Sequence, residues 1–377
     1  MALSAGTKRT VACLLVGLGT LLIVAALLVP TYAVGQLAKT PLDIEITTIA
    51  KNKADAPSEV LDSKSLTSGD GAAKVDQNVR LLSQRFLTVE DPSDKSEMTI
   101  QAGQTLRNID KQGDTGLLSA TIDRVTVDRK TGEPVDTDPN GSIASTVNSK
   151  GESVAEPVQH TGLQYRFPIG TEKQTYPYFD INARKTFDLN FVEETEINDL
   201  KVYHFQQQIP ATDLAKVANS PTNRLALPAT KWGVEGGDQT ITMDRYYTNT
   251  RDIWVEPETG TIIKGSEQLH MYYGRTEKPE VTALKTTLVF DDNTVTSQVS
   301  EAKKYMDELS LYRRILPIVF AVVGVIALII GLVLGLRGGG DSGQPGRLVQ
   351  RRRPNDPGPG ADVADAPTQQ INLSGNQ

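Results

Sequence analysis

Apolar residues divide this chain into two long apolar runs and a segment of short alternating runs between them. The first long run covers residues 11–29 (VACLLVGLGTLLIVAALLV), the second covers residues 315–336 (ILPIVFAVVGVIALIIGLVLGL), and neither contains a charged residue. A helix needs about 20 predominantly apolar residues to cross the hydrocarbon core of a bilayer. We therefore predict two transmembrane helices, at residues 10–33 and 315–336.

Between these runs, apolar and polar residues alternate over short stretches, as they do in half-buried strands. The stretches are rich in Val, Ile, Thr and Tyr and end at Gly, Pro, Asn or Asp; they are residues 44–49, 119–127, 164–167, 201–205, 239–243, 252–255, 261–264, 268–273 and 283–290. Helical patterns are expected at 79–87 and 211–219, and long polar loops at 52–76 and 136–158. The pattern predicts an α+β fold, with a mainly antiparallel β domain between the two helices.

Two segments of the β region have related sequences: VTVDRKTGEPV at 125–135 and WVEPETGTIIKG at 254–265. In the second, Trp254 and Val255 end one strand, residues 257–260 supply a turn with a positive-φ glycine, and an aliphatic strand returns. Both segments are predicted to be β-hairpins. Thr-Gly is also a common turn dipeptide, so the similarity does not require an internal duplication.

Positive charges beside the apolar runs predict how the chain is oriented. Lys8 and Arg9 precede the first run, and Arg337, Arg347 and residues 351–353 follow the second, which places both termini in the cytoplasm. Arg313 and Arg314, before the second run, weaken this pattern. A cleaved signal peptide is the alternative for the first run, but its length favours a retained anchor.

The resulting organisation has six parts. They are a cytoplasmic N-terminus (1–9), transmembrane helix 1 (10–33), an extracytoplasmic β-rich domain (34–296), a juxtamembrane amphipathic helix (297–314), transmembrane helix 2 (315–336) and a disordered cytoplasmic tail (337–377). Pro317 is expected to kink the second helix near the interface. The predicted location is the plasma membrane, with the large domain outside.

Charge and cysteine content exclude several classes of protein. The net charge is −7; the first nine residues carry +2 and the tail from Arg337 carries five arginines against four aspartates, so the segment between carries about −10. An acidic domain of this kind is not a general binder of nucleic acid. Cys13 is the single cysteine, which excludes intramolecular disulfides, and it begins the apolar run instead of following it, which disfavours lipidation.

No constellation in the sequence points to catalysis. The three histidines, His160, His204 and His270, lack a second ligand at metal-binding spacing, and the motifs of serine hydrolases, zinc proteases and nucleotide-binding enzymes do not occur in strand or helix context. Residues 136–142 (DTDPNGS) match the start of a calcium loop, but Val147 replaces its final glutamate. We predict no catalytic residue, metal or cofactor.

Aromatic residues and glycines supply the candidate sites. The segment YRFPIGTEKQTYPYFD (165–180) is dense in aromatics, and together with a later tryptophan it gives five candidates for a lipid- or sugar-facing surface: Tyr165, Phe167, Tyr178, Phe179 and Trp254. The alternative is that these rings form the core of an irregular β domain. Gly331 and Gly335 are spaced to pack against Gly17 or Gly19 of the first helix.

Four blocks, RVTVDRKTGEPV (124–135), YRFPIGTEKQTYPYFD, LKVYHFQQQIP (200–210) and RYYTNTRDIWVEPETGTIIKGSEQLHMYY (245–273), resemble the actinobacterial DUF3068 family, also labelled the porin PorA family. The resemblance implies a cell-envelope protein with two spans and one outward domain. The hairpin at 254–265 also resembles that of lipoprotein carriers, whose fold is a curved sheet or half-barrel that holds acyl chains. Family members often carry paired cysteines after the first Thr-Gly block, and residues 136–138 replace them here.

These observations leave several functions open. We expect a non-enzymatic outward domain that binds, presents or transfers envelope lipid or lipoglycan. The alternatives are a structural or assembly factor that contacts other envelope membrane proteins, a porin-like pore as the family label suggests, and a hydrolase for which the sequence nominates no carboxylate pair. Two apolar helices cannot enclose a water-filled channel by themselves, so a pore would require several copies. The sequence does not determine the oligomeric state.

Overall fold

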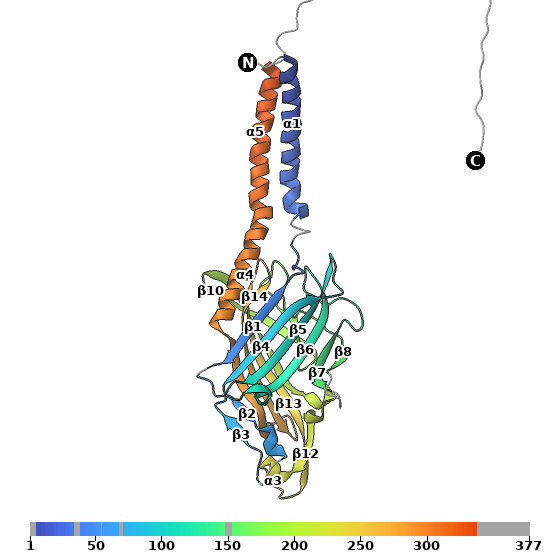
Figure 1. The fold of residues 1–377 in the computed structure, drawn as a ribbon, viewed down its shortest axis with the longest axis vertical. Helices are drawn as coiled ribbons and strands as arrows, with labels where there is room; N and C mark the ends of the chain where they lie inside the picture. Colours follow the sequence, from blue (N-terminus) through green and yellow to red (C-terminus); the bar gives the residue numbers. More distant parts are fainter. Residues whose placement is uncertain (1–4, 34–37, 54, 68–70, 148–152, 338–377) are drawn as a thin grey trace, which may run out of the picture.

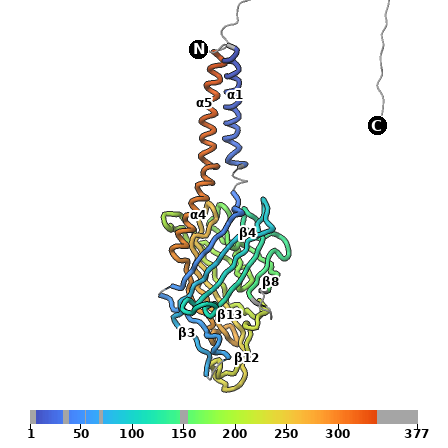
Figure 2. The backbone as a smooth tube through the Cα atoms, in the orientation of Figure 1, coloured from blue at the N-terminus to red at the C-terminus, as the bar shows by residue number. Residues whose placement is uncertain are grey.

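The computed structural model describes residues 5–33, 38–53, 55–67, 71–147 and 153–337. A pair of long helices extends from one end of a β domain (Figures 1 and 2). Helix α1 (Ala5–Leu28), followed by the π-helical turn η1 (Val29–Ala33), lies beside α5 (Leu316–Arg337). We call the end of the β domain from which these helices emerge its helix-proximal end.

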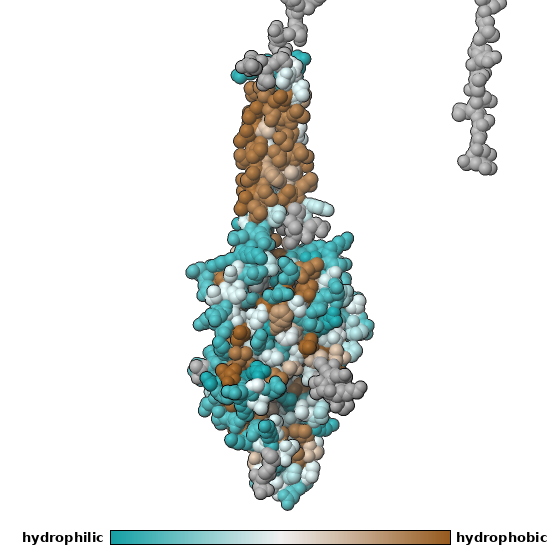
Figure 3. Space-filling view, viewed as in Figure 1, coloured by the Kyte–Doolittle hydropathy of each residue, from teal (hydrophilic) through white to brown (hydrophobic). Residues whose placement is uncertain are grey.

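The helix pair is apolar and the β domain is largely hydrophilic at its surface (Figure 3). Both helices are long and apolar enough to cross a membrane. The first apolar helical segment runs from Gly6 to Tyr32. The second is continuous with the helix that precedes α5, and together they run from Asp292 to Arg337. The start of α1 and the end of α5 lie together at the end away from the β domain (Figure 1).

The β domain is one antiparallel sheet with short helices in its connections. The strands are β1 (Glu45–Asn52), β2 (Glu59–Leu61), β3 (Val75–Gln77), β4 (Leu81–Glu90), β5 (Glu97–Asn108), β6 (Leu117–Asp128), β7 (Gly141–Val147), β8 (Ser153–Val158), β9 (Tyr176–Asp180), β10 (Lys185–Ile197), β11 (Leu200–Asp213), β12 (Arg224–Pro228), β13 (Thr240–Glu256), β14 (Thr261–Gly274) and β15 (Val281–Phe290). The helices are η2 (Ser63–Leu66), η3 (Gly113–Gly116), η4 (Leu214–Lys216), η5 (Pro221–Asn223) and α3 (Ala229–Trp232).

The strand order is β8-β7-β6-β5-β4-β1-β15-β14-β13-β11-β10-β9, with β2, β3 and β12 paired off this path. The first and last strands of the domain, β1 and β15, pair in the middle of the sheet, with Ala50 opposite Phe290. The described sheet is open, with β8 and β9 at its edges. The predicted fold, an antiparallel β domain with two long apolar helices, is therefore confirmed.

The two sheet edges approach each other at one side of the domain. Beyond β8, Leu163 forms an isolated bridge to Tyr178 of β9, and its N–H donates to the Pro177 carbonyl at 2.7 Å. Arg184, in the turn after β9, forms an ion pair with Glu156 of β8 at 2.5 Å. These contacts hold the open sheet in a curved shape around an interior.

Helix α4 (Asp292–Ser310) connects the sheet to the membrane-length helix. Asp291 caps its first turn by accepting a hydrogen bond from the Thr294 N–H at 3.0 Å. Val295, Val299 and Ala302 of α4 are buried against the sheet. The amphipathic helix was predicted at residues 297–314, whereas α4 begins at Asp292 and ends at Ser310. A π-helical turn, η6 (Leu311–Ile315), leads into α5. Pro317, the second residue of α5, has no backbone N–H to donate to the preceding turn.

Glycines lie where α1 and α5 are in contact. A side-chain carbon at Gly19 would come within 2.6 Å of the Gly324 carbonyl, and one at Gly331 would come within 2.9 Å of Val16. A carbon at Gly335 would lie 3.7 Å from the Ala12 side chain, whereas one at Gly17 would meet nothing within 4 Å. The contact therefore uses Gly19 and Gly324 in place of Gly17.

Several local predictions were wrong. Residues 79–87, predicted as a helix, contain most of strand β4, and residues 211–219 contain the end of β11 followed by η4. Strands β2, β7 and β8 and most of β3 lie in segments predicted as loops, and residues 164–167 contain an isolated bridge between Gln164 and Arg166 instead of a strand. Short apolar runs fit both periods, and pairing with neighbouring strands, which one sequence does not show, decides between them.

Candidate functional site

The two related sequence segments form two turns that hold one piece of chain between them. Asp128 accepts hydrogen bonds from the N–H groups of the second and third residues after it, each at 2.8 Å. Glu256 does the same in the other turn, at 2.7 and 2.8 Å. Gly132 and Gly260 then adopt φ values of 74° and 71°. Both segments are turns between paired antiparallel chain, as predicted.

Residues 163–171, which we call the crossing segment, pass between these turns. A side-chain carbon at Gly260 would lie 2.2 Å from the Phe167 carbonyl, and one at Gly132 would lie 3.1 Å from the Arg166 carbonyl. The backbone N–H groups of the crossing segment donate to both turns: Phe167 to Gly260 at 3.1 Å, Ile169 to Lys130 at 3.4 Å and Thr171 to Pro257 at 2.8 Å. The glycines are required because the crossing segment packs directly on their backbone.

The crossing segment presents two polar side chains toward the interior of the sheet. Tyr165 has a φ of 63°, a left-handed conformation that is uncommon for a residue with a side chain and that is enriched at functional sites. Its hydroxyl donates to Asp123 at 2.5 Å. The next residue, Arg166, is only 7% exposed. The left-handed backbone at Tyr165 therefore occurs where the side chains of Tyr165 and Arg166 are directed into the interior.

Three cavities lie in a row between the helix-proximal end and this interior. The outer groove, of about 330 Å³, lies between residues 41–47 and α4. The middle cavity, of about 50 Å³, shares Ile46 and Gln298 with the outer groove. The inner cavity, of about 80 Å³, shares Thr48, Arg85, Tyr165, Ile262 and Phe290 with the middle cavity. Each exceeds the roughly 10–15 Å³ that one water molecule needs.

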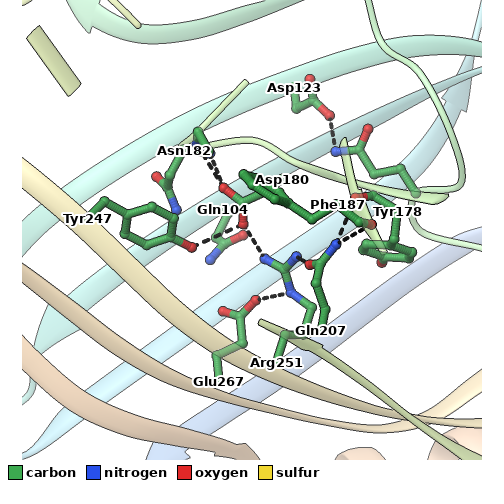
Figure 4. A network of polar contacts seen from close by, with 12 residues as sticks. Gln104, Asp123, Tyr178, Asp180, Asn182, Phe187, Gln207, Tyr247, Arg251 and Glu267 are labelled. Carbon is green, nitrogen blue, oxygen red and sulfur yellow. Dashed lines mark hydrogen bonds and ion pairs between the residues drawn. The ribbon is translucent and has the colours of Figure 1, made fainter. Parts of the chain in front are cut away.

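A buried polar network forms one wall of the inner cavity (Figure 4). Arg251 donates to Asp180 at 2.8 Å, to Glu267 at 2.7 Å and to Gln207 at 2.6 Å. The Tyr247 hydroxyl donates to the same Asp180 oxygen at 3.0 Å. Each buried charge therefore has an oppositely charged partner and further hydrogen bonds, which offset the cost of burying it.

The electrostatics of this wall fix its protonation states. Burial lowers the pKa of Arg251, but the carboxylates of Glu267 and Asp180 outweigh burial and raise it overall. Burial and the charge of Asp180 both raise the pKa of Tyr247. Burial and Asp123 do the same to the pKa of Tyr165. Groups with fixed protonation states near neutral pH suit hydrogen bonding to a ligand better than proton transfer.

The predicted aromatic site is only partly assembled. Tyr165, Tyr178 and Phe179 line the inner cavity. Phe167 is buried in an aromatic core cluster, and Trp254 packs on the opposite face of β13, beneath α4. The role of these five residues in binding stays a prediction.

The segment at 136–142, whose sequence matches the start of a calcium loop, uses Asn140 for a structural purpose. Asn140 donates to the carbonyls of Val135 and His160 and accepts from the His160 N–H at 2.8 Å. Within the described residues, no group of three or more His, Cys, Asp and Glu side chains is placed to hold a metal ion.

Sequence reasoning missed the arginines of the cavities, Arg85, Arg166 and Arg251. Arg85 lies on β4, in the segment that was predicted as a helix, so its inward direction could not be inferred. Arg251 is an inward-facing residue of β13 whose partner Asp180 lies on another strand. The available signal was a charged residue at an inward position of an alternating strand, which becomes visible only when the strand is correctly placed.

Comparison with known proteins covers most of the chain. A family model described as "Porin PorA" matches residues 11–333. A protein of Corynebacterium amycolatum named "Porin PorA" is 31% identical over 382 residues, which cover 86% of this chain and 98% of the relative. A second protein of that name, from Corynebacterium resistens, is 31% identical over 402 residues, which cover 88% of this chain and 97% of the relative.

Proposed function

The chain belongs to the Porin PorA family, and we propose that it has a porin-like role at the cell envelope in which its β domain binds a small molecule. The row of three cavities carries this proposal, because it leads from the helix-proximal end to a polar interior. Ligand sites in proteins are concave and combine apolar walls with a few convergent polar groups. Binding would precede passage or transfer of that molecule.

Native mass spectrometry of the full-length protein in lipid nanodiscs tests this proposal. We expect a small molecule to co-purify with the protein. Thr48 lines both the inner and the middle cavity, so Thr48→Phe should fill this space and reduce the bound fraction. Ser119, exposed on β6, supplies the control Ser119→Phe. Equal occupancy in both variants, or a protein that carries no ligand and binds none of the added probes used below, would refute the proposal.

Envelope lipid or lipoglycan is the ligand class that we propose for these cavities. The outer groove lies beside α4, which continues into a helix of membrane-spanning length, so a molecule leaving the bilayer would meet the groove first. A co-purifying molecule without an acyl or glycan part would contradict this ligand class and leave binding itself intact.

A second candidate is a pore formed by several copies, which the family description and the names of both relatives favour. Within the described residues the sheet is open, and large apolar side chains such as Leu21 and Ile329 face outward from the helix pair. Oligomers would therefore have to supply the channel lining. Conductance steps in planar bilayers, seen only with an oligomeric fraction of the full-length protein, would support this candidate, and their absence in all fractions would oppose it.

A further inference from the structure

The middle cavity has an unusual distribution of charge. Its lining contains two arginines, Arg85 and Arg166, and no carboxylate. The other lining residues are four polar and four apolar side chains: Thr48, Tyr165, Thr261 and Gln298, and Ile46, Leu87, Ile262 and Phe290. The cavity is thus a small, partly apolar space with two guanidinium groups in its walls.

Arg166 is buried without a full set of partners. Its Nη2 donates to the Thr259 carbonyl at 3.2 Å, and its Nε has no hydrogen-bond partner among the described residues. Its guanidinium lies 5.6 Å from the ring centroid of Tyr305. Burial lowers the pKa of Arg166. The carboxylates of Glu301 and Glu256 oppose this by raising the pKa, but neither forms an ion pair with Arg166. Leaving a buried charge so weakly paired is costly, unless a ligand pairs with it.

Arg85 faces the same space from β4. Its Nε and Nη2 donate to a single amide oxygen of Gln104, at 3.2 and 3.0 Å. Its guanidinium also lies 5.7 Å from the Tyr165 ring centroid. Among the described residues, no carboxylate lies within ion-pairing distance of Arg85 or Arg166. In this respect they differ from Arg251, which has two carboxylate partners.

We propose that Arg85 and Arg166 form an anion site in the middle cavity, which binds the carboxylate or phosphate group of the molecule received by the β domain. Arginine is suited to this role because its planar donors match both groups in a bidentate geometry. The apolar side chains beside the arginines would contact the first part of a hydrocarbon chain. This inference rests on the proposed binding function and identifies the chemical group that is recognised.

The outer groove bears on how the anion arrives. Four carboxylates, Asp43, Glu45, Glu301 and Glu308, line it, with Lys304 as the only cation in its lining. This acidic groove repels a small free anion that diffuses in from the solvent. An amphiphile gains additional free energy from burying its apolar part, so its anionic head can still reach the arginines. We therefore expect the site to favour an amphiphile over an inorganic anion.

Equilibrium binding to the full-length protein in phosphatidylcholine nanodiscs tests the site. The probes are dodecyl phosphate, inorganic phosphate and dodecanol, with empty nanodiscs subtracted as background. We expect dodecyl phosphate to bind and dodecanol to bind at least tenfold more weakly, because loss of charge-assisted hydrogen bonds costs roughly this factor or more. Equal binding of dodecyl phosphate and inorganic phosphate would assign the site to free anions.

Variants locate the binding. Arg85→Gln and Arg166→Gln should each weaken dodecyl phosphate binding about tenfold or more, while Arg166→Lys, which keeps the charge, should retain part of it. Arg107 of β5 lies outside all three cavities, so Arg107→Gln is the matched control. Thermal unfolding separates misfolding from loss of binding, because removing a charge that has no carboxylate partner should not lower the melting temperature.

The outcomes separate the site from the proposed function. If a neutral molecule co-purifies and dodecyl phosphate does not bind, the anion site is refuted while binding by the β domain stands. If dodecyl phosphate binds equally to the wild type, Arg85→Gln and Arg166→Gln, the anion lies elsewhere and the assignment is wrong. If nothing co-purifies and no probe binds, both proposals fail.

Discussion

Single residues in the two related turns determine how the crossing segment is held. Asp128 and Glu256 occupy equivalent positions and accept equivalent backbone hydrogen bonds. Gly132 and Gly260 follow them with similar positive φ values. The sequence predicted these turns because Thr-Gly at the end of an alternating run is a local signal. Their common contact, residues 163–171, is not local and was not predicted.

The two glycines should differ in their tolerance of a side chain. Both Gly132→Ala and Gly260→Ala place alanine at positive φ, which costs roughly 1–2 kcal/mol. At Gly260 the added carbon also meets the Phe167 carbonyl at 2.2 Å, compared with 3.1 Å from the Arg166 carbonyl at Gly132. Gly260→Ala should therefore lower the melting temperature of the full-length protein more than Gly132→Ala does. Equal decreases in melting temperature would show that the crossing segment moves away from Gly260 at little cost in free energy.

The turn acids should respond in opposite ways to pH. Burial raises the pKa of Glu256, and the hydrogen bonds of the turn only partly offset it. Burial also acts upward at Asp128, but the N–H groups of Thr131 and Lys130 outweigh it and lower its pKa. The folded state therefore binds the Glu256 proton more tightly than the unfolded state does, and it binds the Asp128 proton less tightly.

The sign of each contribution follows from these directions. As pH rises above the ordinary glutamate pKa of about 4.3, Glu256 should reduce stability until its raised folded pKa is passed. Asp128 contributes stability above the ordinary aspartate pKa of about 3.9, and this stability is lost as pH falls through its lowered folded pKa. Melting temperatures against pH should show that Glu256→Gln removes the first dependence and Asp128→Asn the second. Parallel curves for wild type and both variants would contradict these directions.

Among the elements, the contact between α1 and α5 depends on small residues at particular positions along the two helices. The sequence identified small residues in both helices, and the structure uses Gly19, Gly324 and Gly331 at the contact. Gly17 lies outside the contact between the helices. The rotation of one helix against the other, which decides this, is a property of the tertiary structure. Spacing in one sequence defines a stripe of small residues but not the face that meets the partner.

A designed disulfide tests this helix pairing. The side-chain carbon of Ala12 lies 3.7 Å from the position of one built at Gly335, within the roughly 3.5–4.5 Å of natural disulfides. With Cys13 replaced by Ser, Ala12→Cys with Gly335→Cys should crosslink under mild oxidation. Gly17→Cys with Gly335→Cys should not, because a side chain at Gly17 meets nothing within 4 Å. Crosslinking of both pairs at similar rates would show that the helices rotate freely.

The same limitation explains the element-level errors in the β domain. Residues 79–87 were predicted as a helix, yet Leu81 and Ser83 of β4 are buried at alternate positions, between β1 and β5. Long strands such as β13 were predicted as separate short ones, because polar residues within them, including Asn249 and Arg251, are buried in a sheet whose neighbouring strand β11 is distant in sequence. Tertiary burial of polar groups removes the alternation from which strands are recognised.

For the whole molecule, both helix ends distant from the β domain lie together, which agrees with a topology in which both termini share one side of the membrane (Figure 1). We predict that this side is the cytoplasm. With Cys13 replaced by Ser, Lys216→Cys, whose native side chain is 79% exposed, should react with an impermeant maleimide on intact cells. Lys8→Cys should react only after permeabilisation. The reverse labelling pattern would show that the topology is the opposite of the one predicted. Loss of Lys8 from the mature protein would show that the first helix is cleaved.

The sequence alone determined the two apolar helices, the antiparallel β character between them, the two turns and the family resemblance, because each depends on composition or on residues close in the chain. Only the tertiary structure decided which polar residues meet. Arg85, Arg166 and Gln298 line one cavity although they come from a strand, the crossing segment and α4. Burial of a charge depends on what surrounds it in space, and a single sequence does not contain that information.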